Sequence, residues 1–88
     1  MIRVPRSHTF PGGFKMKVRH VSAETLDAIN GDCGALDSLW VWEDGAGGTL
    51  YLQRGRKPFL KIQDFTHEFV HAANDWRTWY ERKAGGKG

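Results

Sequence analysis

The sequence predicts an α+β fold in which a small antiparallel sheet packs on one long C-terminal helix. Three observations predict it. Residues 14–21 alternate between apolar and polar side chains, as a half-buried strand does. Residues 39–42 and 49–52 are two further strand-like runs, and the glycine-containing segment between them is typical of a hairpin. From Phe59 to about Lys83 no proline or glycine interrupts a run with apolar residues at helical spacing.

Local signals define the elements before the long helix. The first dozen residues, which end in Pro11-Gly12-Gly13, are expected to form an irregular arm closed by a turn. The strand at 14–21 turns its basic side chains to one solvated face: Lys15, Lys17 and Arg19. Ser22 follows at a position suited to cap a short helix, which is expected to end at Asn30-Gly31. Pro58 suits the first turn of the long helix.

Length and composition bound the class of protein. The chain has 88 residues with a net charge of +3, which does not by itself favour a nucleic-acid partner. This length predicts one domain over residues 1–84, followed by a disordered glycine-rich tail at 85–88. Cys33 is the only cysteine, so no internal disulfide forms, and no segment is apolar over the length of a leader or a membrane span. We therefore expect a cytoplasmic protein without a membrane segment.

The long helix separates into two faces when it is drawn at about 100° per residue. One face carries the apolar stripe that is expected to cover the sheet: Ile62, Phe65, Phe69, Ala73, Trp76 and Tyr80. His67 and His71 lie on roughly the opposite face, so they are not expected to be core residues. That face also holds Leu60 and Thr78 rather than a continuous run of charges, and we expect it to line a cleft.

Residues 67–71 read His-Glu-Phe-Val-His, a complete H-E-x-x-H motif. Residues four apart on a helix lie on one face, so His67 and His71 can reach one metal ion. Glu68 lies beside them, placed to take a proton from a water that the metal activates. The motif predicts a zinc hydrolase with Zn²⁺ as cofactor, two imidazole ligands and Glu68 as general base. The competing interpretation is a surface helix with two solvated histidines.

The motif and its surroundings resemble the small zincin-type metallopeptidases encoded by phages and prophages, which are similar to the catalytic core of the ImmA/IrrE group. The resemblance is carried by residues 66–72, which follow a hairpin and precede Asn74-Asp75-Trp76, and by the opening at 10–18. It covers about residues 10–80, and its specific part is the H-E-x-x-H. It implies an α+β fold whose edge strand, here Thr49–Gln53, pairs with an extended peptide substrate. Tyr51 on that strand would border the cleft or face the core.

A catalytic zinc site usually has three protein ligands, and the third is not fixed by the motif. In gluzincin-like relatives it is a Glu on a later helix, but little chain follows His71. Metzincin-like enzymes place it six residues on, after a glycine, where this sequence has Arg77 and Asn74. Asp75, one turn beyond His71, is the predicted third ligand, or else accepts a hydrogen bond from an imidazole. The alternative for Asp75 is a plain salt bridge or a solvated side chain. Glu81 would ligate only if the helix broke.

Other third ligands stay open. His20 lies on the apolar side of its predicted strand, where a packed histidine is the simpler interpretation, and His8 lies in the N-terminal arm. Cys33 lies in the loop expected over residues 31–38, as an inert thiol, a ligand or a switch that blocks the metal. A second copy of the chain would also be able to donate the missing ligand.

These features favour a minimal intracellular zinc metallopeptidase that cleaves a protein or peptide, in the host cytoplasm if a phage encodes it. The alternative is a non-catalytic, metal-stabilised binding or regulatory protein of phage or prophage origin. Nucleic-acid binding is a third interpretation, which rests on the basic strand face at 15–19 and a basic loop with Arg54, Arg56 and Lys57. No aromatic stacking motif interleaves these basic residues, which argues against it.

Overall fold

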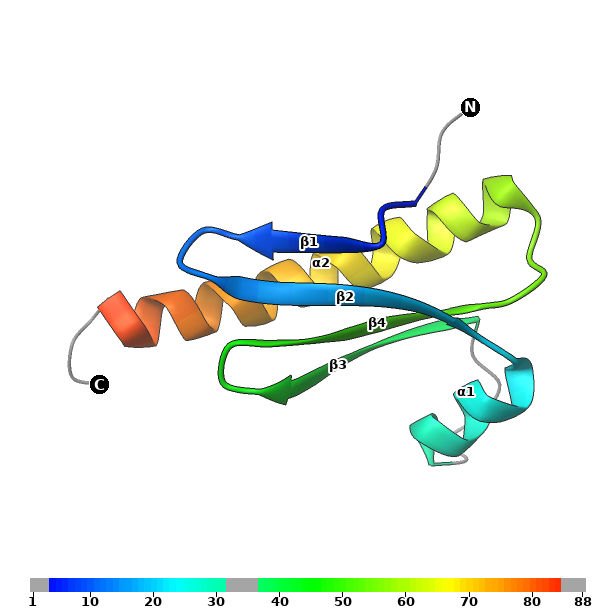
Figure 1. Ribbon diagram of the computed structural model, residues 1–88, viewed down its shortest axis with the longest axis horizontal. Coiled ribbons are helices and arrows are strands. Elements are labelled where there is room, and N and C mark those ends of the chain that lie inside the picture. The colour runs from blue at the N-terminus through cyan, green and yellow to red at the C-terminus, as the bar shows by residue number, and fades with distance from the viewer. Residues whose placement is uncertain (1–3, 32–36, 85–88) are drawn as a thin grey trace.

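The computed structural model describes residues 4–31 and 37–84, except for the side chains of Asp44 and Ala84. The elements are β1 (Ser7–Phe10), β2 (Phe14–Val21), α1 (Ala23–Asn30), β3 (Ser38–Asp44), β4 (Gly47–Gln53) and α2 (Pro58–Ala84). The four strands form one sheet, α2 runs along one of its faces, and α1 lies at one end beside β3 and β4 (Figure 1). The predicted α+β architecture is confirmed. The expected tail at 85–88 lies outside the described residues.

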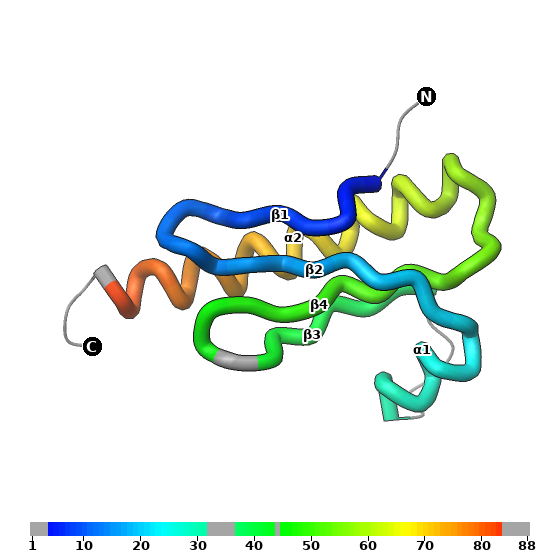
Figure 2. Tube along the Cα trace, viewed as in Figure 1, coloured from blue at the N-terminus to red at the C-terminus, as the bar shows by residue number. Residues whose placement is uncertain are grey.

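The sheet is mixed rather than antiparallel. Its strand order is β1-β2-β4-β3, with β1 and β3 each antiparallel to a neighbour. The two central strands, β2 and β4, run parallel in register from Lys15 opposite Gly47 to Val21 opposite Gln53. Between them the chain passes through α1 and β3 before it returns (Figure 2). The prediction of a wholly antiparallel sheet was wrong because alternation shows that a strand exists, not which strand lies beside it.

The edge strands of the sheet also differ from the predicted one. Thr49–Gln53 belongs to β4, which is paired on both sides, so the prediction that it is the edge strand was wrong. The edges are β1 and β3. Leu50 and Leu52 are fully buried in the core under α2, and strand alternation places Tyr51 on the opposite face. Tyr51 therefore does not border a cleft at α2.

The N-terminal segment is more regular than predicted. Residues 7–10 form the edge strand β1, in register with β2 from Ser7 opposite Lys17 to Phe10 opposite Phe14. The amide N–H of Gly13 donates to the carbonyl of Phe10 across the turn at 3.1 Å, and Gly12 and Gly13 have φ values of 89° and 96°. Phe10 is the only buried residue of β1. A strand with one buried side chain gives no alternation to recognise.

The other local predictions are confirmed. Residues 14–21 form β2, and the hairpin strands are β3 and β4. The Ser22 side chain accepts a hydrogen bond from the amide N–H of Thr25 at 3.1 Å, as an N-cap does. Gly31 ends α1 in the left-handed conformation, with φ 75°. Pro58 opens α2. Within the described part of the chain, neither helix combines the length and the apolar character needed to cross a membrane.

The core lies between the sheet and α2. Its buried members are Phe10, Phe14, Met16, Trp40, Leu50, Leu52 and Ala72. The apolar stripe of α2 contains Phe65, Phe69, Ala73 and Trp76 as predicted, but its centre is rotated. Ala72 and Glu68 are buried, at 0% and 7% exposed, whereas Tyr80 is 42% exposed. The apolar pattern did not predict this rotation, because the residues of α2 that are most buried are the small Ala72 and the charged Glu68.

Candidate metal centre

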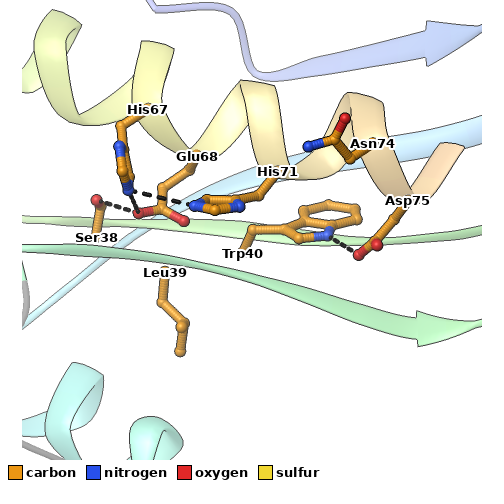
Figure 3. A pocket seen from close by; sticks show the side chains of 8 residues that line it. All are labelled: Ser38, Leu39, Trp40, His67, Glu68, His71, Asn74 and Asp75. Atoms are coloured by element: carbon orange, nitrogen blue, oxygen red, sulfur yellow. Dashed lines mark hydrogen bonds and ion pairs between the residues drawn. The ribbon is translucent and has the colours of Figure 1, made fainter. Parts of the chain in front are cut away.

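The H-E-x-x-H side chains lie where α2 passes over β3. Ser38 and Trp40 of β3 face the same space as the two histidines and Glu68 (Figure 3). An open pocket of about 530 Å³ lies between the helix and this edge strand. Its lining residues are Ser38, Leu39, Trp40, His67, Glu68, His71, Asn74 and Asp75. The motif therefore opens into a pocket beside the free edge of the sheet, as the sequence predicts for a cleft.

The two imidazoles approach each other through their Nε2 atoms. The Nε2 atoms of His67 and His71 lie 3.3 Å apart, and the ring planes are inclined at 79°. Both residues are exposed, with 70% of the His67 side chain accessible. Two nitrogen ligands of a tetrahedral zinc, each at a Zn–N distance of about 2.0–2.1 Å, are roughly 3.3–3.4 Å apart. The pair thus has the separation of two corners of a zinc tetrahedron. Across this distance one imidazole N–H donates to the other ring.

Glu68 lies on the inner side of the helix. Its Oε2 atom accepts a hydrogen bond from Ser38 Oγ at 2.8 Å and lies 4.0 Å from His67 Nε2. The residue is 7% exposed, so its carboxylate is held between α2 and β3 at the base of the pocket. The structure brings the three motif residues together, and the edge strand fixes where the carboxylate points.

Asp75 lies at the other end of the pocket. Its Oδ2 atom accepts a hydrogen bond from the indole N–H of Trp40 at 2.7 Å, and Trp40 lies between it and the motif in Figure 3. The hydrogen-bond donor that the structure gives Asp75 is therefore an indole, and its contact with an imidazole stays a prediction. Among residues 4–31 and 37–84, no group of three His, Cys, Asp or Glu side chains is arranged to hold a metal ion. The third ligand, and Asp75 in that role, stays a prediction.

The other candidate ligands have different surroundings. Glu81 accepts from Arg77 Nε at 3.3 Å, and the His8 ring packs on Phe10 and Phe69 with centroids 4.6 and 5.4 Å apart. Cys33 lies outside the described residues.

His20 is exposed on β2 rather than packed in the core. Its pKa is lowered by desolvation and by the positive charges of Lys61 and Arg54. The structure thus places His20 beside basic side chains, which disfavour a nearby cation.

The predicted basic loop is partly neutralised. Arg56 Nε lies 2.9 Å from Asp64, and the Arg56 guanidinium lies 3.4 Å from Asp37. The hydrogen bond to Asp64 is the main cause that raises the Arg56 pKa. On the strand face, Lys17 lies 3.8 Å from Glu43. These ion pairs weaken the nucleic-acid interpretation.

Ser38 and Trp40 are the site residues that the sequence did not reveal. Ser38 was expected at the end of a loop, and Trp40 was predicted only as a strand residue. Their partners, Glu68 and Asp75, are 30 and 35 residues away in the sequence. No local pattern predicts such a pair, because it depends on the crossing of α2 over β3.

Replacement of Ser38 by Ala should destabilise the fold. The change removes the hydroxyl that donates to the buried Glu68 carboxylate, and an unsatisfied buried polar group costs about 1–3 kcal/mol. Urea unfolding of Ser38→Ala measures the loss. Ser22→Ala, which removes an exposed serine hydroxyl at the cap of α1, is a matched control with an expected cost of about 1 kcal/mol. Equal stability of Ser38→Ala and the wild type would contradict a structural hydrogen bond at Glu68.

Comparison with protein-family models, with curated proteins and with solved structures finds no match to this chain.

Proposed function

We propose that this chain is a minimal zinc metallopeptidase. The observation that carries the proposal is the 3.3 Å separation of the His67 and His71 Nε2 atoms, beside the Glu68 carboxylate in a pocket at a sheet edge. Two imidazoles at this separation suit Zn²⁺, and a carboxylate beside them suits a general base. As for the phage-encoded metallopeptidases that it resembles, the expected substrate is a protein or peptide inside a cell.

Four residues of the pocket have a role in the proposed chemistry. His67 and His71 hold the ion, which supplies Lewis acidity and lowers the pKa of a water molecule when it is bound. Glu68 accepts the proton of the attacking water and passes it to the leaving amine. Ser38 donates to Glu68 Oε2 and so orients the carboxylate.

The substrate is expected to bind along β3. Within the described residues this strand pairs with β4 and with no other strand, and its residues Ser38, Leu39 and Trp40 line the pocket. An extended peptide that adds to the free edge of a sheet is held by main-chain hydrogen bonds, with little dependence on its side chains. Addition to β3 would bring a peptide bond past the histidines. This corrects the predicted substrate strand from β4 to β3.

A metal-stabilised binding protein without turnover is the second candidate. It is favoured by the state of Glu68, which is buried and already accepts a hydrogen bond, as a structural carboxylate does. In that case the ion would stabilise the fold, and Glu68 would join the helix to the sheet.

Cleavage of a mixed peptide library separates the two candidates. The full chain, loaded with zinc, is incubated with the library, and new termini are identified by mass spectrometry. A peptidase produces cleavage that a chelator removes and added zinc restores. Binding of zinc without any cleavage of the library would contradict the proposed peptidase and favour the binding protein.

A further inference from the structure

The exposed face of α2 around the histidines carries several neutral side chains. Those that flank His67 and His71 along the helix are Gln63, Val70, Asn74 and Thr78. Val70 is 54% exposed although it is apolar. The charged side chains of α2 nearest the histidines are Glu68 and Asp75, which accept hydrogen bonds from Ser38 and Trp40. Farther along the helix, Asp64 is paired with Arg56 and Arg77 with Glu81. Around the histidines, a second copy of this chain would therefore meet side chains that are neutral or already have a partner.

The two histidines are exposed enough for a second copy of the chain to reach an ion that they bind. His67 and His71 are both exposed, with 70% of the His67 side chain accessible, and their Nε2 atoms have the tetrahedral separation of 3.3 Å. An ion held by this pair keeps coordination positions that face away from the helix. A two-fold axis through the ion would direct the same pair of a second copy to those positions, because such an interface uses one surface patch twice.

We infer that zinc joins two copies of this chain through the four imidazoles of two His67–His71 pairs. The ion would be four-coordinate, with one zinc for two chains and with the Val70 side chains of the two α2 helices near each other. Such a site has no open position for water or substrate. The dimer shares zinc binding at His67 and His71 with the proposed function but does not require peptide hydrolysis. If the chain is the proposed peptidase, the dimer is its inactive state.

Light scattering on the full chain during zinc titration tests the inference. The molar mass should double, reach its plateau at half an equivalent of zinc per chain, and return to that of one chain with a chelator. His67→Ala and His71→Ala should each stay monomeric. His20→Ala, which removes an exposed imidazole on β2, is the matched control and should form the dimer. A single chain at every zinc ratio, or a dimer that persists in the double alanine variant, would overturn the inference.

Val70→Lys separates the dimer from the metal site. It places two like charges in the proposed interface and should weaken the dimer by at least about tenfold, while one chain still binds zinc. This variant also separates the two proposals. If the wild type forms a zinc-dependent dimer and the Val70→Lys monomer cleaves no peptide, the proposed peptidase is contradicted and the proposed dimer is supported. Zinc-dependent cleavage by a wild-type chain that never dimerises would contradict the dimer and support the peptidase.

Discussion

Glu68→Gln should lower peptide hydrolysis about 10²–10⁴-fold and leave zinc binding intact. The amide has nearly the shape of the carboxylate, and its oxygen still accepts the hydrogen bond that Ser38 Oγ donates at 2.8 Å. What it loses is the ability to accept a proton from the attacking water. The measurement is kcat/KM on a cleaved peptide, beside zinc content and urea unfolding of the same preparation.

The control for this variant is Glu24→Gln, an exposed glutamate in the first turn of α1 and outside the pocket. It should hydrolyse the peptide at the wild-type rate. If Glu68→Gln retains full activity while Glu24→Gln does too, Glu68 is not the base. Loss of zinc in Glu68→Gln would instead indicate that the carboxylate holds the metal, which would also contradict the proposed division of roles.

Removal of both imidazoles should abolish the stabilisation that zinc gives. An ion that binds only the folded chain stabilises it by about 2.7 kcal/mol at one hundred times its dissociation constant. For a domain of this size that corresponds to a Tm rise on the order of 10–20 °C. His67→Ala/His71→Ala should show no such rise, because its side chains can no longer chelate the ion. Thermal unfolding with and without zinc measures both values.

His20→Ala is the control for the double variant. It removes an exposed histidine from β2, so its zinc-dependent rise in Tm should equal that of the wild type. A rise of the same size in His67→Ala/His71→Ala would place the bound zinc elsewhere on the chain. No zinc-dependent rise in the Tm of the wild type would contradict the proposal that the chain binds zinc.

Much of the fold and the centre of the site could be predicted from local patterns. Helical spacing alone places His67 and His71 on one face of α2, and the structure brings their Nε2 atoms to 3.3 Å. Likewise Ser22 and Gly31 bound α1 through their own side-chain and backbone chemistry. In each case the interacting groups are three or four residues apart, so the sequence order is also the spatial order.

The remaining features depend on how distant elements meet. The Ser38–Glu68 and Trp40–Asp75 hydrogen bonds join an edge strand to a helix, and neither strand pairing nor helix spacing indicates them. The same reason explains the error at β4. Its apolar run suits an interior strand as well as an edge, and only the parallel pairing with β2 decides between them.

The central claim is that the Nε2 atoms of His67 and His71 bind the zinc. Nitrogen-15 NMR of the histidine rings, recorded on the full chain as zinc is added, reads these atoms directly. The chain has four histidines. The account predicts that the Nε2 resonances of His67 and His71 shift to the values of metal-bound nitrogen, while those of His8 and His20 do not. Unchanged resonances for His67 and His71 at saturating zinc, or shifts confined to His8 and His20, would contradict it.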